Sequence, residues 1–136
     1  MTTAPLSIVV PVLNEAAGIE ATLQALAPLR ARGAELIVVD GGSTDDTCVR
    51  ARPLADRLVD GPRGRARQMN AGAALASAPR LLFLHADTRL PEAADRHIEA
   101  ALASQALAWG RFDVVIDGRS HMLPVVATLM NHRSRW

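Results

Sequence analysis

The chain has 136 residues, the size of one domain, and its 49% of hydrophobic residues excludes a disordered chain. A net charge of +1 implies no general attraction to nucleic acid or to an acidic membrane, so we expect no nucleic-acid partner. All fifteen basic residues are Arg, which excludes chemistry through a Lys nucleophile, and the single Cys excludes an intramolecular disulfide.

The apolar runs of the chain are all far shorter than the roughly 20 residues that span a bilayer. Residues 1–5 lead directly into a strand-like run and do not form a charged and then apolar leader. We therefore expect a cytoplasmic protein without a transmembrane segment. Attachment to the periphery of the inner membrane is left open.

Strands and helices are predicted to alternate from residue 6 onward. Unbroken apolar runs predict strands covered on both faces at 6–12, 35–39 and 80–84, with a weaker strand at 57–59. Ile19, Leu23 and Leu26 recur at helical spacing. Asn14 is the predicted N-cap of this helix, and the negative charge of Glu15 favours a helix N-terminus. Further helices are predicted from near Asp45, over 65–77 and over 92–104.

The last part of the chain is predicted to add a strand at 108–116 and a helix at 122–130. That helix is apolar on most of its circumference, so we expect it to pack against a second copy, as a homodimer, or to promote aggregation. The alternation predicts an α/β fold with three layers, a doubly wound and mostly parallel sheet, in a single domain over residues 1–136.

Polar residues follow each predicted strand, at the edge where open α/β sheets bind ligands. Asn14 and Glu15 follow the first strand, Asp40 the second and Asp60 the weak one. His85 and Asp87 follow the strand at 80–84. Each residue alone is also explained as a helix cap or a turn residue. The whole set at one edge predicts a binding site.

The stretch at 38–47, VVDGGSTDDT, carries Asp40 at a strand end and two glycines that allow a tight turn. It lacks the Gly-Lys-Ser/Thr ending of a P-loop, and the G-x-G-x-x-G dinucleotide fingerprint is absent after every strand. A carboxylate at a strand end suits a hydrogen bond to a base N–H or to a ribose hydroxyl.

Two further stretches carry groups that suit a diphosphate. At 82–91, LFLHADTRLP, His85 and Asp87 can hold a divalent cation that bridges the phosphates, or they are a packed histidine and a turn carboxylate. At 61–72, GPRGRARQMNAG, three Arg residues lie at the start of a helix, where phosphate is favoured: Arg63, Arg65 and Arg67. The alternative is a solvated basic loop. Asn70 and Gly72 serve close helix packing or a hydrogen bond to the nucleotide.

Together with residues 9–15, VVPVLNE, these stretches resemble glycosyltransferase family 2 in order and spacing. The family pattern is V-P-x-x-N-E, then D-D-G-S-x-D-x-T, then R-x-x-N-x-G on a helix, then a strand that ends in D-x-D. The resemblance covers essentially the whole chain, and the H-A-D-T form is similar to a bacterial branch of the family. It implies a GT-A fold, a nucleoside-diphosphate-sugar donor (a UDP- or GDP-sugar) and a divalent metal, Mn²⁺ or Mg²⁺.

The resemblance also implies roles for particular residues. Pro11 and Glu15 would line the nucleoside pocket, Asp40 would contact the base, and Asp87 would hold the metal with His85 beside it. The residues expected to bind the nucleotide sugar are Pro11, Asn14, Glu15, Asp40, Arg67, Asn70 and Asp87.

The chain departs from the family pattern at three positions and in length. Gly41 stands where the family has the second Asp of D-D-G-S, and His85 replaces the first acid of D-x-D. The family Arg before Asn is displaced, because Met69 directly precedes Asn70. Family members continue well past this length, and the acidic residue that acts as base on the acceptor lies in that part. We therefore expect the chain to lack the acceptor portion and its general base to lie beyond residue 136, although Asp113 is a candidate for the acceptor side.

The resemblance implies an enzyme that transfers a sugar, with inversion, to the hydroxyl of an acceptor. The sequence does not identify that acceptor. A catalytically silent nucleotide-sugar-binding domain is the first alternative, favoured by the H-A-D form and by the length. A sugar nucleotidyltransferase is the second. It would need a glycine-rich basic loop after the first strand, whereas residues 13–15 are Leu-Asn-Glu.

Overall fold

The computed structural model describes residues 4–103, 110 and 112. The chain divides into two compact units, residues 1–98 and residues 99–136. The predicted strand at 108–116 lies outside the described residues apart from Gly110 and Phe112, and so does the whole predicted helix at 122–130. The homodimer through that helix stays a prediction, as does the single domain over 1–136.

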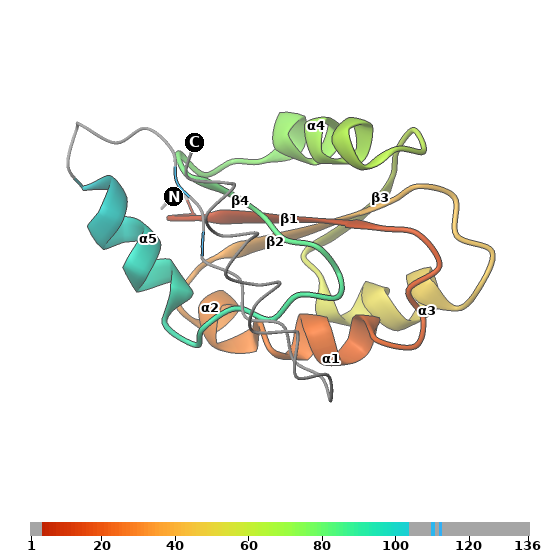
Figure 1. The fold of residues 1–136 in the computed structure, drawn as a ribbon, viewed down its shortest axis with the longest axis horizontal. Helices are drawn as coiled ribbons and strands as arrows, with labels where there is room; N and C mark the ends of the chain where they lie inside the picture. The colour runs from red at the N-terminus through yellow and green to blue at the C-terminus, as the bar shows by residue number, and fades with distance from the viewer. Residues whose placement is uncertain (1–3, 104–109, 111, 113–136) are drawn as a thin grey trace, which may run out of the picture. The chain divides into compact units, whose positions relative to one another are not determined.

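The described part of the first unit contains a sheet of four parallel strands in the order β3-β2-β1-β4 (Figure 1). The strands are β1 (Ser7–Val12), β2 (Glu35–Asp40), β3 (Arg57–Asp60) and β4 (Leu81–Phe83). Every residue of β1 is buried, as are the last five of β2, which confirms that these runs are covered on both faces. The prediction of cover on both faces is wrong for β4, which lies at the edge of the described sheet and leaves Leu81 and Phe83 about 42% and 43% exposed.

Helices lie on both faces of this sheet (Figure 1). The helix α4 (Arg65–Leu75) packs against β1 and β2 on one face. On the other face lie α1 (Ile19–Gln24), α2 (Ala27–Ala31) and α3 (Thr47–Ala51), which continues into the 3₁₀ helix η1 (Arg52–Leu54). A fifth helix, α5, runs from Ala94 to Leu102. The prediction of a three-layer, doubly wound α/β fold is confirmed. In the described part of the chain, no helix is long and apolar enough to cross a membrane.

The prediction that Asn14 caps the first helix is wrong. That helix begins at Ile19 with Gly18 at its N-cap, and Asn14 has a φ of 51°, the left-handed conformation that Asn tolerates better than most residues. The predicted helix is also split after Gln24, because Pro28 has no N–H to continue the helical ladder and instead occupies the first turn of α2.

Close contact between α4 and the sheet depends on Gly72. A Cβ atom at this position would lie 2.3 Å from Cγ1 of Val9 and 3.1 Å from Cγ2 of Val39. Only a residue without a side chain allows the helix to approach β1 and β2 this closely. The role of Gly72 in helix packing is therefore confirmed.

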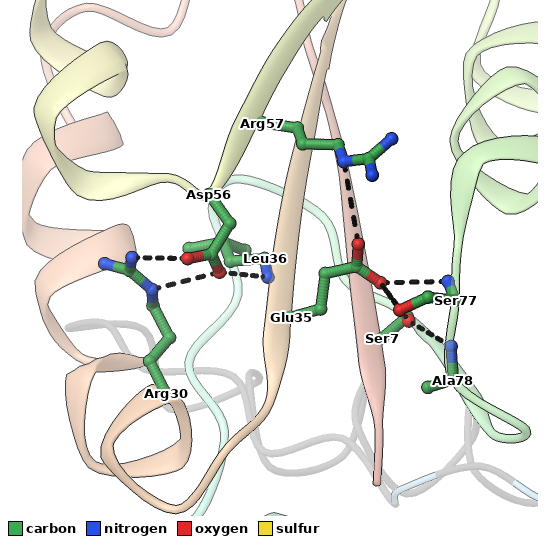
Figure 2. A network of polar contacts seen from close by, with 8 residues as sticks. All are labelled: Ser7, Arg30, Glu35, Leu36, Asp56, Arg57, Ser77 and Ala78. Carbon is green, nitrogen blue, oxygen red and sulfur yellow. Dashed lines mark hydrogen bonds and ion pairs between the residues drawn. The ribbon is translucent and has the colours of Figure 1, made fainter. Parts of the chain in front are cut away.

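The amino-terminal edge of the sheet is held by a polar network around the half-buried Glu35 (Figure 2). One Glu35 oxygen accepts hydrogen bonds from the Ser7 hydroxyl at 2.7 Å, the Ser77 amide at 3.0 Å and the Ser77 hydroxyl at 2.9 Å. The Ala78 amide donates in turn to Ser7 Oγ at 3.1 Å. Burial opposes ionisation of Glu35, but these donors outweigh it and hold its pKa below the usual value.

A second carboxylate, Asp56, ties β2 to the helical layer at the same edge (Figure 2). It accepts a hydrogen bond from the Leu36 amide at 2.7 Å and two from the Arg30 guanidinium, at 2.7 and 3.3 Å. Burial again works against the charge, and the bonds from Arg30 and Leu36 lower the pKa of Asp56 in spite of it. This edge is therefore occupied by structural ion pairs, and the opposite edge is the one available for a ligand.

Candidate functional site

The carboxyl ends of the strands meet at one edge of the sheet. In the register of the strands, Val12 of β1 lies beside Asp40 of β2, and Asp40 lies beside Asp60 of β3. The Leu84 amide extends the β4 pairing with a hydrogen bond of 3.0 Å to the Val9 carbonyl, and His85 follows directly. The predicted polar residues thus follow parallel strands at the same edge, as open α/β sheets require of a ligand site.

Two loops interlock at this edge. The Asn14 amide donates to Ser43 Oγ at 2.9 Å, and Asn14 Oδ1 accepts from the Thr44 amide at 2.8 Å. One residue further, the Glu15 amide donates to Thr47 Oγ1 at 2.8 Å. The left-handed φ of Asn14 brings its backbone and side chain to face the second loop together. The loop after β1 and the loop after β2 are therefore a single structural element.

Asp40 is the buried centre of this element, with 3% of its surface exposed. One oxygen accepts the amides of Gly42 at 3.1 Å and Ser43 at 3.0 Å, and the other accepts the hydroxyl of Ser43. Burial disfavours the charge, but the hydrogen bonds from Ser43 and Gly42 prevail and lower the pKa of Asp40. The ionised carboxylate holds the loop and is almost fully buried, so a base N–H reaches it only where one of these donors moves aside.

The turn after β4 carries the two candidate metal ligands. Asp87 is exposed and His85 is half-buried. The turn is closed by the Thr88 amide, which donates to the His85 carbonyl at 3.0 Å. From α1, the buried Thr22 hydroxyl donates to the Ala86 carbonyl, between the two candidate ligands, at 2.5 Å. The turn is thus held by a residue distant in sequence.

The donor set of this turn fits a metal that is held mainly by a diphosphate. Among residues 4–103, 110 and 112, no three His, Cys, Asp or Glu side chains gather as a ready metal site. Mg²⁺ commonly takes one or two protein carboxylates, with phosphate oxygens and water as its other ligands, and Asp87 supplies one such carboxylate. The Nδ1 atom of His85 is buried and has no hydrogen-bond partner among the described residues, so this imidazole is not committed to a structural bond there.

The remaining predicted residues lie around the same edge. Pro11 is buried in β1, beside Val39 of β2, and Glu15 is half-buried. Arg67 and Asn70 lie exposed on the first turns of α4, whose N-cap is Gly64 with a φ of 132°. The structure thus joins the loops after β1 and β2 by hydrogen bonds, whereas Arg67 and Asn70 form no hydrogen bond or ion pair with the described residues of those loops.

Gln68 is a buried polar residue that no sequence pattern predicted. It is 4% exposed, and its Nε2 donates to the Val12 and Val39 carbonyls, each at 2.9 Å. Its spacing offers one signal, because Gln68 lies four residues before Gly72 and therefore on the helix face that contacts the sheet.

A parallel sheet between helical layers, with Asp, Asn and Arg in the loops at its carboxyl edge, defines an α/β protein of the nucleotide-binding class. The chain matches the family model described as Glycosyl transferase family 2 over residues 7–134, and it belongs to that family. The family membership expected from the four motifs is confirmed.

A curated relative and two solved structures agree with this. The PGL/p-HBAD biosynthesis glycosyltransferase of Mycobacterium tuberculosis is 43% identical over 94 residues, which cover 64% of this chain and 37% of that protein. Glucosyl-3-phosphoglycerate synthase of the same organism, crystallised with Mn²⁺, UDP and glucosyl-3-phosphoglycerate, has a TM-score of 0.64 and 29% identity over 74% of this chain and 39% of the other.

A mannosyltransferase from Pyrobaculum calidifontis, in complex with GDP-Man and Mn²⁺, has a TM-score of 0.60 and 27% identity over 74% of this chain and 32% of its own. These likenesses confirm the glycosyltransferase fold of GT-A type. The chain spans just over a third of the length of the mycobacterial relative, 37%.

Proposed function

We propose that this chain binds a nucleoside-diphosphate sugar at the carboxyl edge of its sheet and that the whole protein transfers the sugar to an acceptor hydroxyl with inversion. The observation that carries the proposal is the interlocking of the loops after β1 and β2 in a chain of glycosyltransferase family 2. Two structurally similar proteins were crystallised with UDP or GDP-Man, which supports a UDP- or GDP-sugar as the donor.

The nucleoside is assigned to the loops after β1 and β2. Pro11, Asn14 and Glu15 form one side of this pocket, and Asp40 contacts the base by exchanging one of its loop bonds. A carboxylate with a lowered pKa stays ionised at neutral pH and accepts a base N–H strongly. This part of the binding needs no metal.

The diphosphate is assigned to the other half of the edge. Arg67 and Asn70 lie near the N-terminus of α4, where guanidinium and backbone amides favour phosphate. Asp87, with His85 as the second ligand, would hold Mn²⁺ or Mg²⁺ there. When bound, the metal stabilises the negative charge that develops on the diphosphate as the leaving group. The chain's own residues orient the donor, and the base for the acceptor is not assigned to any of them.

A catalytically silent nucleotide-sugar-binding domain is the second candidate. It is favoured by His85, which replaces an acid of the family pattern and offers a neutral ligand where the family has an anionic one. The cytoplasmic location, and any attachment to the inner membrane, stay predictions.

Calorimetric titration with UDP and GDP, each in Mn²⁺ and in EDTA, tests the proposal. Micromolar binding of one nucleotide, strengthened by Mn²⁺, is the expected result. Failure of both nucleotides to bind would contradict it. Release of free nucleoside diphosphate from the matching nucleotide sugar, in the presence of an acceptor screen, separates a transferase from a silent binding domain.

A further inference from the structure

The side chain of Gln68 joins three segments that the candidate site uses. Its Nε2 donates to the last-but-one carbonyl of β2, at Val39, and to the last carbonyl of β1, at Val12. Its Oε1 accepts the Gly64 amide at 3.2 Å, at the start of α4. Both amide protons and the carbonyl of this buried group are therefore used, and each bond ends on backbone.

These anchor points lie next to the predicted ligand contacts. Val39 directly precedes Asp40, and Val12 lies two residues before Asn14. Because the carboxamide holds both strand ends at once, it reinforces the bond of 3.0 Å from the Gly41 amide to the Val12 carbonyl and helps to set the distance between Asn14 and Asp40. The turn at 84–88 is not among its contacts.

Gly41 leaves the space that the same carboxamide occupies. A Cβ atom at this position would lie 2.7 Å from Oε1, 2.8 Å from Cδ and 3.0 Å from Nε2 of Gln68, and these are its three nearest atoms. Gly41 does not have the positive φ of Gly42 and Gly64, so the need for glycine here is one of space. The family pattern has an acidic residue at this position, and such a side chain would have to displace Gln68.

We infer that Gln68 is a positioning residue of the nucleotide pocket. Gly41 and Gln68 are a matched pair, because the absence of a side chain at position 41 leaves room for the Gln68 carboxamide. The positioning role rests on the proposed function, because it assumes that the pocket binds a nucleotide. Where the family pattern has an acidic side chain at position 41, this chain has the uncharged carboxamide of Gln68. The nucleoside side of the site is therefore held by hydrogen bonds from Gln68 to the backbone.

Gln68→Glu and Gln68→Ala test the positioning role, with Gln24→Glu on the exposed face of α1 as the matched control. Glu keeps the shape but sets an oxygen against the Val12 and Val39 carbonyls. We expect UDP or GDP affinity to fall by about tenfold or more in both variants, at a temperature where circular dichroism shows them folded. The ratio of affinities in Mn²⁺ and in EDTA should stay that of the wild type, because the metal turn is untouched.

The nucleotide affinity and its ratio between Mn²⁺ and EDTA together separate a positioning role from a purely structural one. If the folded variants bind the nucleotide as tightly as the wild type and the Gln24→Glu control do, Gln68 only stabilises the fold and the inference is overturned. If the metal ratio collapses together with the affinity, Gln68 does not act on the nucleoside side alone, and the assignment is equally wrong. Should Gln68→Glu fail to fold, Gln68→Ala alone decides, since it introduces no charge.

The matched pair is tested without any ligand, by a double-mutant cycle on urea unfolding. Gly41→Ala should lower the unfolding midpoint in the wild-type background and lower it much less in the Gln68→Ala background, because the crowded carboxamide has gone. Additive effects would refute the pair. If the wild type binds neither nucleotide, the proposed function fails and the positioning role fails with it, whereas the outcome of this cycle still stands on its own.

Discussion

Replacement of Asp40 by Ala probes both the loop and the ligand. The carboxylate accepts the amides of Gly42 and Ser43 at 3.1 and 3.0 Å and the Ser43 hydroxyl. Hydrogen bonds to a charged group contribute about 1.5–3 kcal/mol each, but water can reach the half-buried Ser43 and partly replace them. We therefore expect the free energy of unfolding to fall by about 2–3 kcal/mol in total.

The same substitution should weaken nucleotide binding whether or not metal is present. Loss of one charge-assisted bond to the base costs about 1.5–3 kcal/mol, which is tenfold or more in affinity. Loosening of Ser43 adds to this, because its hydroxyl also accepts the Asn14 amide. Asp46→Ala, an exposed change of the same charge in the same loop, is the control and should bind like the wild type.

The assay is calorimetric titration of UDP and GDP into folded protein, in Mn²⁺ and in EDTA. Wild-type affinity in Asp40→Ala would show that Asp40 does not contact the nucleotide and is only a turn residue. An equal loss in Asp46→Ala would show that net charge, and not the bonds of Asp40, governs binding.

Three further predictions concern the metal turn and the opposite edge. Asp87→Ala should abolish the gain in nucleotide affinity on adding Mn²⁺, whereas His85→Ala should reduce it only in part, because a hard carboxylate oxygen is the preferred ligand; a full gain in Asp87→Ala, measured by titration, would place the ion elsewhere. Thr22→Val keeps the shape but loses the bond to the turn, so it should lower the Mn²⁺ gain while Thr22→Ser retains it; equal gains in both would show that the bond does not position the turn. Glu35 and Asp56 have lowered pKa values in the folded protein, so the stability they contribute is complete above their unfolded values of about 4 and is lost as the pH falls through the folded ones. The urea midpoint of unfolding should therefore fall as the pH is lowered below about 4, and it should fall less steeply in Glu35→Gln. An equally steep fall in Glu35→Gln would show that Glu35 does not contribute to this pH dependence.

Much of the fold follows from local patterns in the sequence. Burial of β1 and β2 on both faces appears in the sequence as apolar runs without alternation, and the parallel sheet follows from the helices between them. Strand ends at a shared edge then place the polar residues of four loops at that edge. The approach of α4 to the sheet is visible in the sequence as Gly72 within a helical segment.

Features that depend on distant contacts do not follow from local patterns. Asn14 was expected to cap a helix, a local interaction, but its side chain is satisfied by Thr44, 30 residues away. The bonds of Gln68 to β1 and of Thr22 to the turn after β4 span 56 and 64 residues. Spacing places Gln68 on the side of its helix that faces the sheet, but only the assembled layers show which backbone groups Gln68 and Thr22 bond.

Binding of a nucleoside diphosphate together with a divalent metal at the carboxyl edge of the sheet, as we propose, can be tested by NMR. Paramagnetic broadening by Mn²⁺ in ¹⁵N-labelled protein, recorded with and without UDP or GDP, locates the ion directly. We predict that amide signals of residues 14–16, 42–44 and 86–88 broaden when metal and nucleotide are both present, while those of Ser77 and Ala78 at the opposite edge keep their intensity. Broadening at Ser77 and Ala78, or broadening that does not depend on the nucleotide, would show that the ion does not bind with the nucleotide at the carboxyl edge.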